Sequence, residues 1–318
     1  MIGIVSHDGD LHATTVRTHL DELGAGVVRL DTAEMPEHVS LTTWTRPDGD
    51  WTAEWGFDGI DASQLRVMWW RRPQPFRPPG QLRTPEDRMF VIGECAAAVA
   101  GLWSCLDAVW VNDPDRDEAA SRKMWQLKVA SELGLRVPRT CMTNSPDRAR
   151  QFLAEEPGSV VYKGFTATPE TWRETRLVGE TELEQLEQVR FSPVIFQEAI
   201  PGGCDIRVTV VGDELFPAQI VVPDGGYEYD FRLHSDQSAI TPITLPDTVS
   251  AGLLALMRRL DLWYGAIDLR RSPDGEYVFL EVNPAGQWLF VEYATGQPIS
   301  AALARLLADL DRRHLRAA

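Results

Sequence analysis

The feature that most constrains this chain is a pair of apolar strand patterns near its C-terminus, each carrying a carboxylate. The first pattern, YGAIDLRR, places Asp268 among apolar residues, and the second, YVFLEVN, ends on Glu281 and Asn283. The segment SPDG between them has the composition of a β-turn, so the two patterns predict a paired hairpin. Residues i and i+2 of a strand share a face, so Glu281 and Asn283 point the same way and Asp268 can converge on them.

Two carboxylates and an amide oxygen, with no His or Cys, form a set of hard oxygen donors. Such a set suits Mg²⁺, which binds few protein oxygens and shares phosphate oxygens for the rest. The alternative is a solvated strand edge followed by a turn, although burying an unpaired Asp268 carboxylate would be costly. The hairpin therefore predicts either a Mg²⁺–nucleotide site or an ordinary strand end.

Basic residues upstream of the hairpin offer partners for a nucleotide phosphate. Lys163 ends the apolar strand pattern SVVYK, and Lys123 lies on a predicted helix over 115–134. A lysine at such a place would pair with a phosphate as a point charge, or would remain a solvated surface residue. Arg232, in YDFRLH, is a further cation that could be directed at a γ-phosphate.

Polar residues also mark the strand pattern that follows Lys163. This strand ends in Gln197 and Glu198, and such a strand end could recognise an adenine edge. Asp205 and Arg207, in GCDIRV, share one strand face by the i, i+2 rule. Arg207 has two interpretations, a phosphate-binding cation or one half of a cross-strand ion pair. The sequence contains no Walker A motif and no GxGxxG motif, so no single motif identifies a nucleotide.

The first 112 residues alternate strand and helix patterns, which predicts an open α/β sheet. MIGIVS and GVVRLD are strand patterns on either side of the helix pattern LHATTVRTHLDELG. SLTTWT and WTAEWGF flank the turn sequence RPDGD and predict a hairpin, and RVMWWRRP predicts a strand that stops at Pro73. CAAAVAGLWSCLDAVWV predicts a buried helix and strand, because polar residues interrupt it before it reaches the length of a membrane span.

The net charge and the cysteine content limit which partners, metal centres and cellular compartment we expect for this protein. The formal net charge of −16 and the sequence pI of about 4.8 make nucleic acid an unexpected partner, because an acidic chain repels phosphate backbones. The four cysteines have no CxxC spacing, which argues against a zinc or redox centre and fits a reducing cytosol. The N-terminus lacks the basic segment of a signal peptide. We therefore expect a cytoplasmic protein with no membrane partner.

The order of these features resembles the ATP-grasp fold over about residues 112–287: a helix lysine, a strand lysine, QEAI, DIR, an arginine, and an aspartate followed by LEVN. The chain resembles ribosomal-protein glutamate ligases and graspetide synthetases, the peptide macrocyclases of the microviridin type. VSHDGDLHATTVRTHLDELGAGVVRLDTAEMP, WWRRP and EVNPAGQW favour the synthetases. The resemblance implies an α/β fold with α+β lobes: an N-terminal open α/β pre-ATP-grasp domain (1–112), a central ATP-grasp lobe (113–196) and a C-terminal ATP-grasp lobe with the metal site (197–318).

The resemblance also assigns the candidate residues to groups around ATP and Mg²⁺. The residues implied to bind ATP phosphates are Lys123 and Lys163. The implied adenine hinge comprises Gln197, Glu198 and Ile200, with Asp205 near the ribose or the incoming substrate. Arg207 and Arg232 would steady the γ-phosphate and the acyl-phosphate. Asp268, Glu281 and Asn283 would hold Mg²⁺. The loop 164–176 is Thr-rich, which departs from the family pattern.

The implied reaction activates Asp or Glu carboxylates of a ribosomal precursor peptide as acyl-phosphates. A Ser, Thr or Lys side chain of the same peptide then displaces phosphate and closes an ester or amide ring, with loss of one water. The resemblance also implies a homodimer. One alternative is a ligase that joins a free amino acid to a peptide or protein C-terminus. Another is a non-catalytic ATP-binding regulator, against which the presence of both lysines and all three metal candidates argues.

Two N-terminal segments keep two interpretations each. The His7–Asp10 loop follows the first strand, where ligands bind in open α/β sheets, but a plain turn would have the same sequence. The segment WWRRPQPF, at 69–76, could bind the peptide core, or could be a packed tryptophan pair with solvated arginines.

Overall fold

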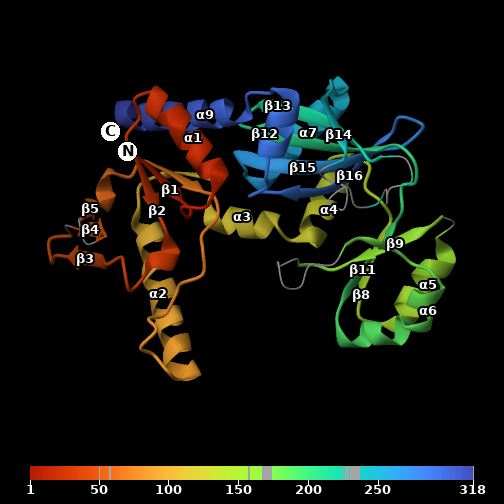
Figure 1. The fold of residues 1–318 in the computed structure, drawn as a ribbon, viewed down its shortest axis with the longest axis horizontal. Coiled ribbons are helices and arrows are strands. Elements are labelled where there is room, and N and C mark those ends of the chain that lie inside the picture. Colours follow the sequence, from red (N-terminus) through yellow and green to blue (C-terminus); the bar gives the residue numbers. More distant parts are fainter. Residues whose placement is uncertain are drawn as a thin grey trace.

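The computed structural model describes residues 1–49, 51–56, 59–156, 158–166, 174–223, 225, 229 and 237–317. These residues form three regions (Figure 1). An N-terminal α/β region lies at one end, a five-stranded sheet lies in the middle, and a smaller antiparallel sheet lies at the other end. The mixture of a parallel sheet and antiparallel sheets with helices confirms the predicted α/β fold class.

The N-terminal region is built on a four-stranded parallel sheet, which agrees with the open α/β sheet that the strand and helix patterns predicted. Its strand order is β2-β1-β6-β7. The strands are β1 (Ile2–Val5), β2 (Val27–Leu30), β6 (Val67–Trp70) and β7 (Val109–Val111). Helix α1 (Leu11–Glu22) connects β1 to β2. A separate hairpin sheet comprises β3 (Leu41–Thr45), β4 (Trp51–Trp55) and β5 (Ile60–Asp61).

The helix expected at the start of CAAAVAGLWSCLDAVWV is present but only partly buried, and it begins ten residues earlier, at Pro85. Helix α2 (Pro85–Cys105) projects away from the parallel sheet (Figure 1), and Met89 and Phe90 are 73% and 67% exposed. Only residues in its C-terminal half, such as Val99 and Leu102, pack into the core. By length and composition alone, α2 is long and apolar enough to cross a membrane. Alanines and glycines around the whole helix give it no clear polar face, so the sequence does not indicate which residues are covered.

The single helix expected over 115–134 is two helices in the structure. Helix α3 (Pro114–Ala120) and helix α4 (Lys123–Glu132) are separated by a break. Gln126, which is 2% exposed, donates from Nε2 to the carbonyls of Ala120 (2.6 Å) and Val282 (2.7 Å), and its Oε1 accepts from the Val282 amide (3.1 Å). This side chain thus satisfies the end of α3 and ties α4 to the C-terminal sheet.

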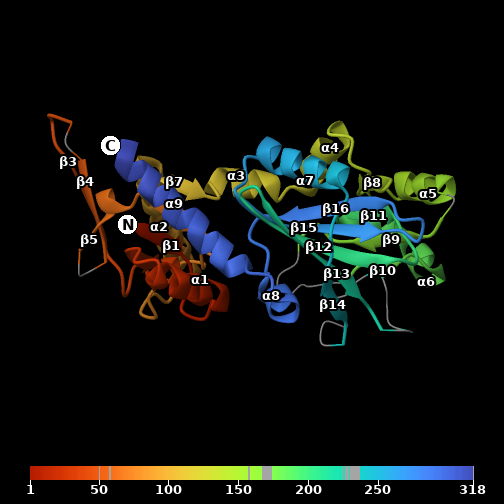
Figure 2. The ribbon, with the colours of Figure 1, turned by 90° about the horizontal axis from the view of Figure 1, so that it is seen from above.

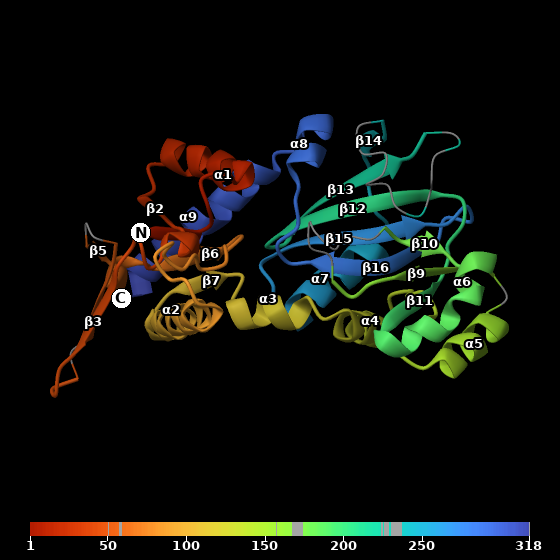
Figure 3. The same cartoon turned by 60° about the horizontal axis from the view of Figure 1, so that its bottom comes forward.

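The central feature of the fold is a five-stranded antiparallel sheet in the order β14-β13-β12-β15-β16. The strands are β12 (Cys204–Val211), β13 (Glu214–Val221), β14 (Ala239–Pro242), β15 (Tyr264–Arg271) and β16 (Tyr277–Asn283). Helices α4 and α7 (Asp247–Leu260) cover one face (Figure 3), where Ile206, Val208 and Leu256 are buried. Because successive side chains of a strand alternate, Asp205 and Arg207 point to the other face.

A small antiparallel sheet forms the remaining region, in the order β10-β9-β11-β8. Its strands are β8 (Thr140–Thr143), β9 (Val160–Lys163), β10 (Arg176–Leu177) and β11 (Val194–Glu198), with helices α5 (Pro146–Glu155) and α6 (Glu180–Glu184) beside them. Strand β10 corrects the expectation that the whole Thr-rich segment is a loop, because it pairs with Val161 and Tyr162 of β9. The middle of that segment, 167–173, lies outside the described residues.

The two ends of the chain lie together in the N-terminal region. The amphipathic helix predicted at the C-terminus is α9 (Ile299–Ala317), and it lies against α1 (Figure 2), where Leu303 and Leu307 join Leu20 in one core. Asp311 accepts hydrogen bonds from the Met1 amino group (3.1 Å) and from Nε of Arg66 (2.8 Å). Helix α8 (Leu289–Thr295) lies between β16 and α9 in the sequence and leads the chain back.

Candidate functional site

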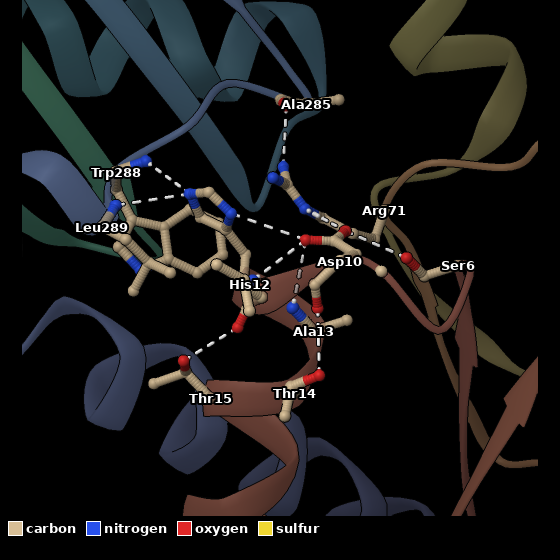
Figure 4. Close-up of polar contacts among 12 residues, drawn as sticks. Ser6, Asp10, His12, Ala13, Thr14, Thr15, Arg71, Ala285, Trp288 and Leu289 are labelled. Carbon is tan, nitrogen blue, oxygen red and sulfur yellow. Dashed lines mark hydrogen bonds and ion pairs between the residues drawn. The ribbon is translucent and has the colours of Figure 1, made fainter.

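A buried arginine joins the end of β6 to the loop that follows β16. Arg71 Nε donates to Asp10 Oδ2 (3.1 Å), and its NH1 donates to the carbonyls of Ala285 (2.7 Å) and Gly286 (3.0 Å) (Figure 4). Arg71 is 1% exposed, and its guanidinium lies 5.0 Å from the centroid of the Trp288 ring. The N-terminal region is therefore fixed to the segment that directly follows the predicted metal strand.

Asp10 and His12 complete this junction from the start of α1. Asp10 caps the helix and also accepts from Ser6 Oγ (2.9 Å). Burial would raise the pKa of Asp10, but its hydrogen bonds with His12 and Ser6 and the charge of Arg71 lower it. His12 Nε2 accepts from the backbone amide of Trp288 (3.2 Å), so the ring is neutral, and burial lowers its pKa. This arrangement fits the turn interpretation of the His7–Asp10 loop.

The pairing of β15 with β16 brings the three metal candidates to one face of the sheet. Asp268 lies opposite Glu281, and Ala266 lies opposite Asn283. Residues opposite each other in antiparallel strands project from the same face. An irregularity in β16, where Leu280 is the extra residue, sets this register, and such bulges occur near active sites.

The three candidates line a cavity of about 900 Å³ in the described part of the chain. Of the other candidates, Lys163, Asp205 and Arg207 line the same cavity. The cavity therefore gathers two of the candidate cations and the oxygen donors of β15 and β16 around one space. Arg232, which was assigned to the phosphate group, lies outside the described residues.

Cations surround the carboxylates of this cavity. Lys123 Nζ donates to Glu281 Oε2, although Lys123 is not itself among the lining residues. Burial alone would raise the pKa of Glu281, but the charges of Lys123, Lys163 and Arg207 together lower it to about 2. Glu281 is therefore ionised at neutral pH and available as an oxygen ligand.

Arg207 forms a cross-strand ion pair, which was one of the two interpretations of this residue. It lies opposite Asp268 in the register of β12 and β15, with 3.3 Å between Arg207 NH1 and Asp268 Oδ1. Its Nε and NH1 are nevertheless buried and have no hydrogen-bond acceptor among the described residues. Its guanidinium also lies 5.7 Å from the ring centroid of Phe290. An arginine with unused donors beside a cavity can still bind an anion.

Asp205 is held in a similar cross-strand pair. Its Oδ1 accepts from Arg270 NH1 (2.9 Å), and Arg270 Nε donates to the carbonyl of Ile200 (2.6 Å). The charged face of the sheet therefore alternates acids and arginines between β12 and β15. This pattern keeps the Asp205 side chain at the cavity wall.

The three predicted hinge residues do not line the cavity among the described residues. Gln197 is buried and donates from Nε2 to Thr140 Oγ1 (3.0 Å). Glu198 accepts from Arg136 NH2 (2.6 Å) and from the backbone amide of Arg139 (2.9 Å). The carboxylate of Glu198 and the carbonyl of Ile200 are thus engaged inside the protein, so the adenine-binding role stays a prediction.

Several residues at the site were not identified from the sequence. Gln126 holds the backbone of Val282 between the two ligand candidates of β16, and Phe290 and Tyr293 of α8 form part of the cavity wall. The spacing of Phe290 and Tyr293 by three residues is typical of one helix face and could have indicated a helix there. No local signal connects Gln126 with a strand 156 residues away.

The oxygen donors at the end of the β15–β16 hairpin suit Mg²⁺ when a nucleotide supplies further ligands. No three Asp, Glu, His or Cys side chains in the described ranges form a metal centre by themselves. Two carboxylates and the amide oxygen of Asn283 remain, which are hard donors that suit Mg²⁺ when phosphate oxygens and water complete the coordination. The residues therefore fit a nucleotide-linked Mg²⁺ better than an ion held by protein alone.

Comparison with known proteins identifies the family. Residues 1–118 match the family model described as MvdD pre-ATP grasp domain. Macrocyclase MdnB from Microcystis aeruginosa MRC is 32% identical with a TM-score of 0.80, and the match covers 96% of this chain and 98% of that one. The chain belongs to the graspetide synthetase family of ATP-grasp ligases.

Two further proteins resemble this chain over different lengths. A RiPP-associated ATP-grasp ligase from Chryseobacterium gregarium, solved with ADP and a leader and core peptide, is 27% identical with a TM-score of 0.88, covering 97% of this chain and 96% of that one. A probable alpha-L-glutamate ligase from Hahella chejuensis is 30% identical over 191 residues, which are 58% of this chain and 61% of that protein. The graspetide synthetases thus match both the N-terminal region and the ATP-grasp core.

Proposed function

We propose that this protein uses ATP to macrocyclise a ribosomal precursor peptide, joining Asp or Glu side chains to Ser, Thr or Lys side chains through ester or amide bonds. The observation that carries the proposal is the cavity in which Lys163 and Arg207 face the oxygen donors Asp268, Glu281 and Asn283. Relatives described as a macrocyclase and as a ligase solved with leader and core peptides support a peptide substrate.

The residues of the cavity have different roles in the proposed reaction. Mg²⁺, held by the oxygen donors of β15 and β16, would offset the negative charge of the ATP phosphates. Lys123 and Lys163 would bind phosphate oxygens as point charges. Arg207 would direct its unused donors at the transferred phosphoryl group and the acyl-phosphate. Arg232 is assigned to the same role by family resemblance alone.

The proposed chemistry requires alignment and charge stabilisation more than a protein nucleophile. Cys204 is the cysteine next to this site in the sequence, but it is buried and its pKa is raised by that burial. Its thiol therefore remains protonated at neutral pH and is a poor nucleophile. The attacking group comes instead from the peptide.

Mass spectrometry of a peptide substrate tests the proposed function. The probe is the product of a short open reading frame next to the gene for this chain, chosen for an acidic, Thr-rich tail and incubated with the protein, ATP and Mg²⁺. We expect a product that has lost one water per ring, with one phosphate released for each ring. A gain of one amino-acid residue would instead support the glutamate-ligase alternative, and an unchanged peptide without phosphate release would support the regulator.

Replacement of Lys163 with alanine should weaken ATP binding. A hydrogen bond to a charged group contributes about 1.5–3 kcal/mol, so we expect the dissociation constant to rise about 10- to 100-fold. Isothermal titration calorimetry measures this change. Lys128→Ala is the matched control, because Lys128 is exposed on α4 and pairs with Glu132. An unchanged affinity in Lys163→Ala would place this lysine away from the nucleotide.

We also propose that the protein is a homodimer in the cytoplasm. The exposed apolar side chains of α2, including Met89, Phe90 and Ile92, form a surface that a second copy would cover. The four cysteines are free, as is usual in a reducing compartment. Light scattering of the purified protein tests the dimer, and a monomeric mass at micromolar concentration would contradict it.

A further inference from the structure

A histidine of the N-terminal region caps the helix that forms one wall of the cavity. His12 Nε2 accepts hydrogen bonds from the backbone amides of Trp288 (3.2 Å) and Leu289 (3.3 Å), at the start of α8 (Figure 4). The first amides of a helix have no acceptor within the helix itself. Trp288 cannot supply one from its side chain, because an indole only donates. One imidazole nitrogen, 276 residues away in the sequence, therefore satisfies the start of α8.

The His12 ring is held from its other side as well. Its Nδ1 lies 3.5 Å from Asp10 Oδ1, which favours the tautomer with the proton on Nδ1 and leaves Nε2 as an acceptor. The buried Trp288 ring packs edge-on against it, with 4.5 Å between the ring centroids. Because this contact is largely shielded from solvent, loss of the acceptor would leave both amides of α8 unsatisfied, which is costly.

Helix α8 carries an aromatic part of the cavity wall. Phe290 and Tyr293 are one turn apart and both line the cavity, and Tyr293 is 73% exposed. The helix lies between the N-terminal region and β14 (Figures 2 and 3), whereas Lys163, which we assign to a phosphate, comes from β9 in the small sheet. Exposed aromatic side chains give a large contact area to a bound peptide. This wall therefore suits a ligand other than the nucleotide.

We propose that neutral His12 positions α8 for the peptide substrate, so that Phe290 and Tyr293 hold the peptide only while the cap on α8 is intact. His12 is a positioning residue, because it is not among the described residues that line the cavity and acts through α8. This inference rests on the proposed function and deepens it, since it assigns the α8 wall to the peptide and not to ATP.

A charged His12 ring could not keep this cap, because an imidazolium donates from both nitrogens and accepts at neither. The charged side chains that act on the ring are Asp10 before α1 and Arg71 and Arg72 after β6. The acid on α8, Glu292, accepts instead from the start of α9. Burial lowers the pKa of His12 below its ordinary value, and the opposing effect of Asp10 is smaller. The ring is therefore neutral at neutral pH, and the cap is lost only as the pH falls through this lowered pKa.

Titration of peptide and of ADP into variants of His12 tests this role without turnover. The peptide probe is the same product of the neighbouring open reading frame, titrated by calorimetry in the presence of ADP and Mg²⁺. His12→Leu removes the acceptor, and we expect it to weaken peptide binding about tenfold or more while the affinity for ADP stays the same. His12→Gln should recover most of the loss, because its amide oxygen can accept near the position of Nε2.

The pH dependence separates positioning from folding. Wild-type protein and His12→Gln are compared across the range in which NMR shows the His12 ring to titrate. Acidic groups of the peptide titrate in both measurements, so the ratio of the two affinities reports on His12. We expect the wild-type protein to lose peptide affinity relative to His12→Gln as the pH falls, because glutamine does not titrate. This comparison holds even if His12→Leu does not fold.

His19→Leu is the matched control, because His19 lies on the outer side of the same helix and pairs with Glu22. It should change neither affinity. Hydrogen exchange at the Leu289 amide should be faster in His12→Leu and slow again in His12→Gln. Unchanged peptide affinity in His12→Leu, equal losses for peptide and ADP, or the same pH dependence in wild type and His12→Gln would each overturn the assignment.

The outcomes distinguish this role from the proposed reaction. A wild-type protein that binds the peptide but forms no macrocycle would refute the proposed function, and the loss of peptide affinity in His12→Leu would still support the positioning role. A wild-type protein that forms the macrocycle, with unchanged peptide affinity in His12→Leu, would refute the positioning role alone. A wild-type protein that binds no peptide would refute both.

Discussion

Replacement of Glu281 with glutamine is expected to lower the rate of peptide-dependent phosphate release by about 100-fold or more. Glu281 lies opposite Asp268 at the cavity, and its lowered pKa keeps it ionised. Glutamine has the same shape but lacks the charge that a divalent cation requires. It also cannot balance Lys123, which would be left beside the cavity without its carboxylate partner.

The measurement is steady-state phosphate release at saturating ATP and increasing Mg²⁺. Glu276→Gln is the matched control. Glu276 directly precedes the same strand and is more exposed than Glu281, and its ion pair with Arg136 Nε is loose, at 3.5 Å. Circular dichroism and thermal unfolding should show that both variants fold. Wild-type turnover in Glu281→Gln would remove this residue from the metal site.

Replacement of Arg71 with alanine should lower the free energy of unfolding by about 3–5 kcal/mol, because it leaves a buried carboxylate without its cation. Arg71 and Asp10 are both almost fully buried, at 1% and 5% exposure. The loss would also release the carbonyls of Ala285 and Gly286, which follow the metal strand. Catalysis should therefore fall together with stability.

Urea unfolding measures this effect, and the exposed Arg77→Ala is the control. A double variant, Asp10→Asn with Arg71→Met, should lose less stability than the sum of the single variants, because neither partner is then left charged and buried. If Arg71→Ala lowered the free energy of unfolding by less than about 1 kcal/mol at neutral pH, the junction would not be stabilising.

The junction should also make stability depend on pH. The pKa of Asp10 is lowered in the folded protein, so the contribution of Asp10 to the free energy of unfolding is present above the ordinary carboxyl pKa and is lost as the pH falls.

The parts of the fold that the sequence predicted depend on local patterns. The parallel strands of the N-terminal sheet are short apolar runs, and the β15–β16 hairpin follows from two strand patterns around SPDG. Alternation along a strand placed Asp205 with Arg207 and Glu281 with Asn283, and all four residues line the cavity. The alternation of side chains along a strand was therefore sufficient to predict which site residues lie together when both belong to the same strand.

The features that sequence analysis missed depend on contacts between distant segments. The break between α3 and α4 is held by Gln126, whose partner Val282 lies in another region. Glu198 looked like an open strand end, but Arg136 engages its carboxylate. The N-terminal half of α2 is exposed because no other described segment covers it. The apolar composition of the helix does not indicate whether a neighbouring segment covers it.

Crystals of the protein with ADP and Mn²⁺ in place of Mg²⁺ test the central claim most directly, because anomalous scattering locates the metal. We expect a Mn²⁺ ion bonded to the carboxylates of Asp268 and Glu281 and to the amide oxygen of Asn283, with ADP phosphate oxygens completing its coordination. A Mn²⁺ ion bound away from all three side chains, with Glu281 still paired to Lys123, would contradict the account.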